Sequence, residues 1–430
     1  MSSSATTTDA GAEFPPAPHH DHEHDDNPVE LNPPETWHDP KRYAWLLGLI
    51  VPLSPFLAWG AVELTGVTAL WFAGPLVVFG VFPILDWLIG VDTDNPPDSV
   101  LAWLEADKYY RYVVYAYIPI QYAGLIFACY QWAYGGLSTL ESVGLALTIG
   151  TVSGIAINTA HELGHKREKV ERRMSKVALA QTFYGHFFIE HNRGHHVRVS
   201  TPEDPASSRF GESFYEFWPR TVYGSLTSAI EIEKKRLDRL GKSFWSLQND
   251  LVNAWMMSVA LFVALVAVFG WVVLPYLILQ AVMGFSLLEV VNYLEHYGLL
   301  RQKKDDERYE RCQPSHSWNS NNVASNVFLY HLQRHSDHHA HPTRRYQALR
   351  HFEQAPNLPS GYATMIVVAL VPPLWRRTMD HRVIEHYNGD ITRANILPRK
   401  RDKVISKFGS GSGSSGSGNS GPGKAATAGA

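Results

Sequence analysis

The sequence predicts an all-α membrane protein of about six transmembrane helices with a histidine-rich cap at their cytoplasmic end. The chain has 430 residues, of which 45% are hydrophobic and only 18% charged, whereas an ordinary soluble domain has about 25% charged residues. Apolar blocks of about 20 residues, the length needed to cross a bilayer, recur along it. Beyond His38, most of the histidines gather in four short motifs.

Composition divides the chain into three parts. Residues 1–40 are expected to be a disordered tail, polar, Pro-containing and rich in His and acid. Residues 41–408 are expected to be the transmembrane domain. Residues 409–430 have the composition of a flexible Gly/Ser linker, either an artificial tail or a connection to a further domain.

The apolar blocks predict helices rather than barrel strands, which would alternate apolar and polar residues over about ten positions. The six expected spans lie near 43–64, 68–90, 112–132, 139–160, 252–272 and 275–296. Short turns join the first two and the last two spans into helical hairpins. A shorter apolar run at 361–374 contains Pro372 and Pro373, and we expect an interfacial or re-entrant segment there.

Loop charge predicts the orientation, because Lys and Arg are enriched on the cytoplasmic side of membrane proteins. The turns that follow spans one, three and five carry no Lys or Arg, whereas basic runs such as KREKVERR at 166–173 follow span four. Both termini and the polar segments 161–250 and 297–408 are therefore expected to be cytoplasmic. The net charge of −3 does not favour nucleic acid as a partner.

The four histidine motifs are HELGH, EHNRGHH, EHYG and RHSDHH. Their spacings of three and four residues place imidazoles on one face of a helix, so we expect each motif to present its histidines together. All four motifs lie at the cytoplasmic end of the predicted spans. The candidate ligands are His161, His165, His191, His195, His196, His296, His335, His338 and His339. One metal takes at most about six ligands, so nine imidazoles favour two metals.

Other classes explain fewer of these residues. HELGH matches the H-E-x-x-H signature of zinc metalloproteases, but that reading uses two histidines and leaves seven. A carboxylate-rich diiron bundle needs two Glu-x-x-His pairs, and only Glu162 with His165 forms one. A metal transporter would place its ligands near the middle of the bilayer rather than at one end of the spans. Two cysteines, Cys129 and Cys312, are too few for a thiolate cluster.

Acids stand beside the histidines in every motif. We hypothesise that they accept the distal imidazole N–H and fix its tautomer; the alternative is that they are solvated surface acids. Glu289 falls on one stripe of span six with Asn292 and His296, facing either the metals or a neighbouring helix through a hydrogen bond. The candidate acids are Glu162, Glu190, Glu289, Glu295 and Asp337.

Together these motifs resemble the membrane-bound alkane monooxygenases over roughly residues 40–405. The three histidine boxes are shared with fatty acid desaturases. The NYLEHYG motif at 292–298 is typical of alkane and xylene hydroxylases instead, and the second box has three residues before its His pair where desaturases generally have two.

The resemblance implies that the nine histidines hold two non-haem irons. It implies conversion of medium- to long-chain n-alkanes to 1-alcohols with O2, in a bacterial inner membrane. Rubredoxin, supplied by its reductase, would deliver the electrons, and the tail after Ser406 is where a fused rubredoxin could attach. The aromatic-rich segment 103–122 is a candidate to line a substrate tunnel, or to pack as an interfacial belt.

Overall fold

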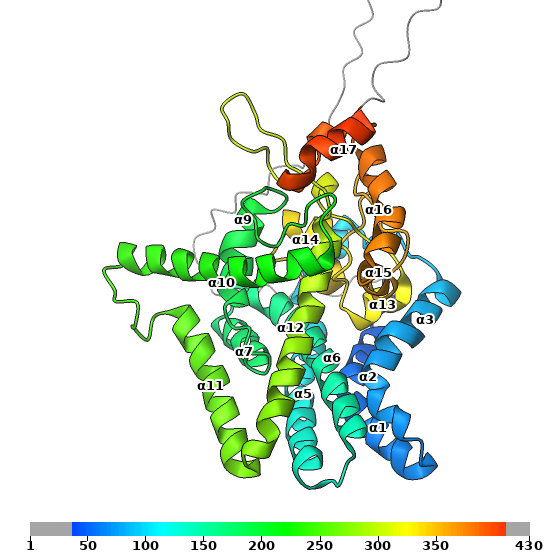
Figure 1. Cartoon of the computed structure of the whole chain (residues 1–430), viewed down its shortest axis with the longest axis vertical. Coiled ribbons are helices and arrows are strands. Elements are labelled where there is room, and N and C mark those ends of the chain that lie inside the picture. Colours follow the sequence, from blue (N-terminus) through cyan, green and yellow to red (C-terminus); the bar gives the residue numbers. More distant parts are fainter. Residues whose placement is uncertain (1–36, 410–430) are drawn as a thin grey trace, which may run out of the picture.

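A computed structural model describes residues 37–409, so the terminal segments predicted at 1–40 and 409–430 lie almost wholly outside the described part. The described residues form helices joined by loops, with no β-strand among them beyond isolated bridges. Figure 1 shows long helices at one end of the molecule and shorter helices gathered at the other. This arrangement confirms the all-α fold class.

Six helical stretches within residues 37–409 are long and apolar enough to cross a membrane, at the positions predicted. The first joins a 3-10 turn to α1 (Ile50–Thr65), and the second joins several short segments, from η2 (Thr68–Phe72) through α2 (Ala73–Leu76) and η3 (Val77–Val81) to α3 (Phe82–Ile89). The other four contain α5 (Lys108–Tyr134), α6 (Thr139–Gly164), α11 (Asp250–Phe269) and α12 (Leu274–His296).

Local sequence signals explain where these helices begin and end. Ser138 and Glu141 form a capping box that begins α6, with each side chain bonded to the other's backbone N–H. The hairpin turns depend on Gly66 and Gly270, whose φ angles of 70° and 84° lie in the region that favours glycine. The two predicted helical hairpins are therefore present.

The helix pair with the most extensive contact in the bundle is α6 with α12. A Cβ at Gly150 would lie 2.5 Å from Met283 Cβ, and one at Gly154 would lie 2.9 Å from the Gly284 carbonyl oxygen. Small residues four apart allow two membrane helices to approach this closely. Ser153 adds an interhelical hydrogen bond, donating to Gln280 Oε1 at 2.8 Å. The pairing sets the relative height of the histidines that both helices carry at their ends.

The cap consists of the long helix α10 and several shorter helices near the ends of α6 and α12 that carry the histidines. In Figure 1, α10 lies across the bundle, and α14, α16 and α17 lie above it. The cap helices are α7 (Lys169–Ala180), α8 (Phe187–Glu190), α9 (His196–Arg198), α10 (Phe214–Arg239), α13 (Val323–Phe328), α14 (His335–Ala340), α15 (Tyr362–Ala369), α16 (Pro372–His386) and α17 (Arg401–Phe408).

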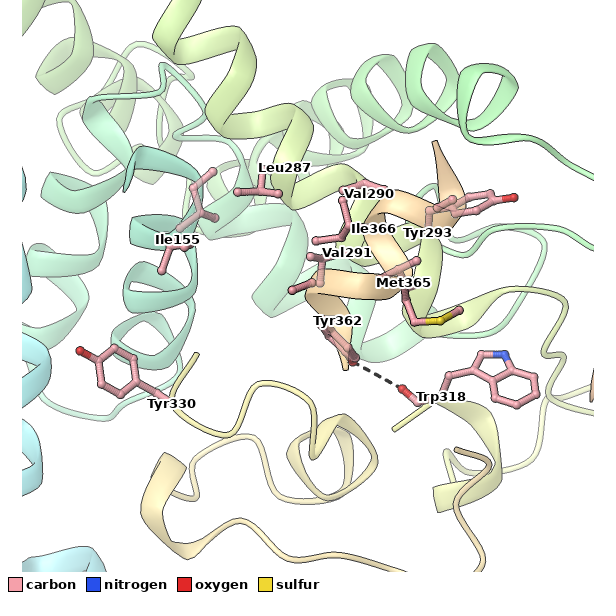
Figure 2. Packing of buried hydrophobic residues seen from close by; sticks show 14 of the residues in the cluster. Ile155, Leu287, Val290, Val291, Tyr293, Trp318, Tyr330, Tyr362, Met365 and Ile366 are labelled. Carbon is pink, nitrogen blue, oxygen red and sulfur yellow. Dashed lines mark hydrogen bonds between the residues drawn. The ribbon is translucent and has the colours of Figure 1, made fainter. Parts of the chain in front are cut away.

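The apolar run at 361–374 forms α15, which is largely buried and packs against α12. Its two prolines begin α16, in the first turn where a missing N–H costs nothing. Figure 2 shows Val291 of α12 beside Ile366 of α15 within the main hydrophobic core. The cap and the bundle therefore share one core.

Candidate metal centre

The structure brings all nine predicted histidines together, in two neighbouring groups. In each group the ring nitrogens that face one another lie within 4.8 Å of one another. The five-His group consists of His161, His165, His191, His196 and His338, and the four-His group consists of His195, His296, His335 and His339. The motifs EHNRGHH and RHSDHH therefore each contribute histidines to both groups. Their spacing predicts instead that each motif presents its histidines together.

The second motif is divided because its backbone is a π-helix, η5 (His191–His195). A π-helix is wider than an α-helix and hydrogen-bonds residues five apart, so a residue five positions on also returns to the same face. His191 consequently meets His196, with 3.1 Å between their Nε2 atoms, while His195 turns to the other group. His191 and His195 still share one face as predicted, with stacked rings whose centroids lie 5.2 Å apart, but they belong to different groups.

The motif on α14 is divided although the helix is regular. His335 and His339 are one turn apart, and their Nε2 atoms lie 2.9 Å from each other. His338 points about 100° away from His339, and its Nε2 lies 2.8 Å from that of His161 on α6. The α14 helix therefore stands between the groups and contributes to both.

The two groups differ in burial. His165 and His196 of the five-His group are partly exposed, whereas all members of the four-His group are buried. The pKa of His191, of His338 and of most other candidate histidines outside the spans lies well below the ordinary value. Burial is the main cause, and repulsion by neighbouring imidazoles is the second. These imidazoles are neutral near pH 7, which is the form that binds metals.

The arrangement of nitrogen atoms fits two metal ions. The Nε2 atoms of His335 and His296 approach to 3.3 Å, and those of His338 and His196 to 3.1 Å. Buried polar atoms normally have a hydrogen-bond partner, yet Nε2 of His165 and of His195 has none in the described structure. Several ring nitrogens pointing at a common space are what a bound cation would satisfy, and imidazole suits iron, zinc and copper.

Four of the five predicted acids do not contact the nine imidazoles. Glu162 pairs with Lys166, Glu190 with Arg198, and Asp337 with Arg344 and His341, while Glu289 accepts bonds from Tyr184, Thr221 and Asn292. An acid next to a histidine on a helix points about 100° away from it, so these carboxylates meet groups of other elements. For Glu289 the bond from Thr221 of α10 is the interhelical hydrogen bond of the second alternative.

Glu295 is the exception among the predicted acids. Its Oε2 lies 3.3 Å from Nε2 of His335, and its Oε1 accepts a hydrogen bond from the Tyr362 hydroxyl at 3.0 Å. The contact is to Nε2, the nitrogen that faces the other histidines, rather than to the distal nitrogen that we predicted. This carboxylate therefore borders the four-His group itself.

Asp204 takes the role predicted for the adjacent acids. It lies nine residues beyond His195, in a loop, with its Oδ2 2.9 Å from His195 Nδ1. Burial alone would raise the pKa of Asp204, but His195 and the Ser207 hydroxyl outweigh this and hold the pKa below its ordinary value. Asp204 also raises the pKa of His195, against the effect of burial. His296 finds a different partner, the His316 carbonyl oxygen at 3.2 Å from Nδ1.

A narrow apolar pocket leads from the histidines into the bundle. Stripes of α6 and α12 form two of its walls, from Gly154 to His161 and from Leu287 to Glu295, and α15 adds Ile366. Its lining consists of Val78, Phe82, Gly154, Ile155, Asn158, His161, Phe187, His191, Leu287, Leu288, Val291, Asn292, Glu295, Leu329, Leu332, His335, Ala363 and Ile366. Members of both histidine groups thus stand at its polar end.

Similarity to known proteins extends over most of the chain. Residues 138–369 match the fatty acid desaturase family. The chain is 50% identical over 379 residues to an alkane 1-monooxygenase of Acinetobacter baylyi, covering 86% of this chain and 92% of the relative. It is 46% identical over 376 residues to alkane 1-monooxygenase 1 of Alcanivorax borkumensis, covering 87% and 93%. The chain belongs to the alkane 1-monooxygenase family.

Membership of the alkane 1-monooxygenase family confirms the resemblance inferred from the histidine motifs. A more distant relative is the hydroxylase component of a xylene/toluene monooxygenase from Pseudomonas putida, 30% identical over 246 residues, which are 55% of this chain and 63% of the relative. With six candidate spans, this family member is a multi-pass membrane protein. The cytoplasmic location of its cap stays a prediction.

Sequence reasoning missed several residues of the site in this alkane 1-monooxygenase family member. Asp204 lies in a loop nine residues beyond His195, and the His316 partner is a backbone carbonyl, so no helical spacing rule could find them. The pocket is lined by none of the residues in the aromatic segment 103–122, so the tunnel alternative for that segment was wrong. Its tyrosines pack instead; for example, the Tyr117 hydroxyl donates to the Val152 carbonyl oxygen.

Proposed function

We propose that this chain hydroxylates the terminal carbon of medium- to long-chain n-alkanes, using O2 and electrons from rubredoxin at two iron ions. The observation that carries the proposal is the placement of both histidine groups at the polar end of a narrow apolar pocket. The names of the relatives support alkane hydroxylation in particular. The overall reaction takes R–CH3, O2, two electrons and two protons to R–CH2OH and water.

In this proposal His161, His165, His191, His196 and His338 hold one iron, and His195, His296, His335 and His339 hold the other. The bound irons supply the activation of O2 that attack on a strong C–H bond requires. Asp204 keeps His195 in one tautomer by accepting its Nδ1–H. Glu295, steadied by the Tyr362 hydroxyl, places a carboxylate beside His335.

The pocket supplies orientation and excludes water. An alkane offers no polar group, so its position has to come from the shape of the apolar walls formed by α6, α12 and α15. A linear chain that enters the pocket end-first presents its terminal carbon to the histidines, which supports attack at that carbon. The partly exposed His165 and His196 offer the shortest route for electrons from a surface-bound rubredoxin.

The proposal also places the protein in a bacterial inner membrane with the cap in the cytoplasm, where a rubredoxin and its reductase would be available. We further propose that the segment 409–430 connects, or once connected, this domain to a rubredoxin. The basic residues predicted on the cap side of the spans support this orientation.

The test is metal analysis of the purified protein combined with turnover of octane by added rubredoxin, reductase and O2. The expected result is about two irons per chain and O2-dependent formation of 1-octanol. Omitting rubredoxin is the control, and it should abolish turnover. About one zinc per chain, or no alcohol with a proven electron supply, would overturn the proposal.

A further inference from the structure

Two asparagine side chains interrupt the apolar walls of the pocket. Asn158 lies on α6, three residues before His161, and Asn292 lies on α12, four residues before His296. Three or four residues correspond to about one helical turn, or roughly 4.5–6 Å along the axis. Both amides therefore stand next to the histidine groups, between them and the apolar depth of the pocket.

Hydrogen bonds fix which way each amide faces. Nδ2 of Asn158 donates to the Leu329 carbonyl oxygen at 2.6 Å. Nδ2 of Asn292 donates to Glu289 Oε2 at 3.2 Å, and Tyr184 and Thr221 hold that carboxylate in place. A carbonyl or carboxylate oxygen can only accept here, so the NH2 groups must face these partners.

The carbonyl oxygens of the two amides are left without a donor. No described residue donates a hydrogen bond to Oδ1 of Asn158 or of Asn292. Neither oxygen is fully enclosed by protein atoms, so a ligand can reach both. Both residues line the pocket. An unpaired amide oxygen beside an apolar cavity costs free energy, and an alkane cannot relieve that cost.

We propose that Asn158 and Asn292 form a hydroxyl-binding subsite for a primary alcohol. The alcohol O–H donates to the Oδ1 atom of either asparagine while the alkyl chain fills the apolar depth between α6 and α12. The identity of the ligand rests on the proposed function, because a primary alcohol is its product. The pocket then binds a 1-alkanol more tightly than an ether of the same size, and the product competes with fresh alkane.

The test compares two isomers, 1-decanol and methyl nonyl ether. They share one molecular formula, but only the alcohol can donate a hydrogen bond. Each is added to initial-rate assays of octane hydroxylation by the iron-loaded protein, with rubredoxin and reductase, and its inhibition constant is measured. One hydrogen bond to a neutral acceptor predicts about three- to tenfold stronger inhibition by the alcohol.

Variants test whether the asparagines cause this preference. Asn158→Leu and Asn292→Leu keep the side-chain size and remove the acceptor. Each should lower the ratio of the ether's inhibition constant to the alcohol's, and the double variant should bring this ratio to about one. Leu288→Val changes the shape of the same pocket without changing its polarity, and should leave the ratio as in the wild type. Equal inhibition by both isomers in the wild type, or an unchanged ratio in the double variant, would overturn the subsite.

A second measurement separates this proposal from the proposed function. Binding to the folded state raises the melting temperature by an amount that grows with the logarithm of ligand concentration over Kd, so stabilisation by the two isomers at one concentration can be compared without turnover. Alcohol-specific stabilisation that both Asn→Leu variants weaken, in a protein that never oxidises octane, would support the subsite and refute the proposed function. Octane turnover with equal stabilisation by both isomers would support the proposed function and refute the subsite.

Discussion

The two histidine groups use the same side chain in different surroundings. The five-His group is partly open at His165 and His196, whereas the four-His group is buried and has the carboxylates of Asp204 and Glu295 against it. The five-His group has more imidazoles and more contact with solvent. The four-His group has fewer imidazoles, and carboxylates contact His195 and His335. We infer that the first is the exchangeable side of the centre and the second is its protected side.

The largest expected effect comes from removing one ligand from either group. His338 and His339 are neighbours on α14 but belong to different groups. Each His→Ala change should lower octane hydroxylation by more than the 10- to 100-fold that loss of an outer hydrogen-bond partner costs. His339→Ala leaves three imidazoles in its group and should lose about one metal per chain, whereas His338→Ala leaves four.

Elemental analysis under limiting iron measures this difference. His338→Ala leaves four imidazoles in the five-His group, and four nitrogen ligands can still complete a tetrahedral site. This variant should therefore keep more metal than His339→Ala. Equal metal loss in both variants would mean that the two groups do not hold separate ions.

The next effect concerns the carboxylate behind His195. Asp204→Asn keeps the size of the side chain but weakens its hold on the imidazole N–H, and should lower metal affinity by about 10–100-fold. The control is Glu203→Gln, an exposed change in the same loop. Metal titration followed by absorbance or calorimetry would measure both. An affinity equal to that of the wild type would exclude Asp204 as a support of the four-His group.

Chelation tests the difference in exposure directly. Dialysis against EDTA should remove metal in two phases, because a chelator reaches His165 and His196 before the buried group. The His339→Ala variant, which should retain only the metal of the five-His group, should show the fast phase alone. A single phase in the wild type would argue against unequal access.

A change in helix packing should have a smaller effect. A Cβ at Gly154 would lie within 3.0 Å of Leu287 and of the Gly284 carbonyl oxygen, so Gly154→Ala should separate α6 from α12. We expect a loss of about 1–3 kcal/mol, the usual cost of overpacking. Gly60→Ala is the matched control, because its Cβ would meet nothing within 4 Å. Thermal unfolding in detergent would compare them, and equal melting temperatures would contradict the close approach.

The smallest effect concerns pH and the support of α12 by α16. Tyr297, which follows His296, donates to Asp380 Oδ1 at 2.9 Å, and burial raises the pKa of Asp380 to about 6. Because the charged form is disfavoured in the fold, this carboxyl destabilises the protein increasingly as pH rises from about 4 to 7.

Asp380→Asn removes that titration and keeps an acceptor for Tyr297. The variant should match the wild type near pH 4 and exceed it at pH 7 by no more than the roughly 3 kcal/mol of a two-unit pKa difference, and by less because solvent screens this part-buried carboxyl. Unfolding measured at both values would check this, and a constant difference would show that Asp380 does not titrate in this range.

Much of the fold was predictable because membrane spans are long apolar blocks, and all six lie where hydropathy placed them. The nine histidines were predictable as a set because each motif is compact. Their division into two groups was not predictable, because the residues HNRGH carry no signal for a π-helix. His338 also contacts His161, almost 180 residues away in sequence. Asp204 and the two pocket asparagines depend on loop paths and helix rotation, which spacing alone does not determine.

Two covalent links join the histidine groups. His195 and His196 are consecutive, as are His338 and His339, and each pair has one member in each group. Consecutive Cα atoms are held about 3.8 Å apart by the trans peptide. The backbone separation of the two ligand sets at these points is therefore set by covalent geometry, and sliding of the membrane helices in a bilayer of different thickness leaves it almost unchanged.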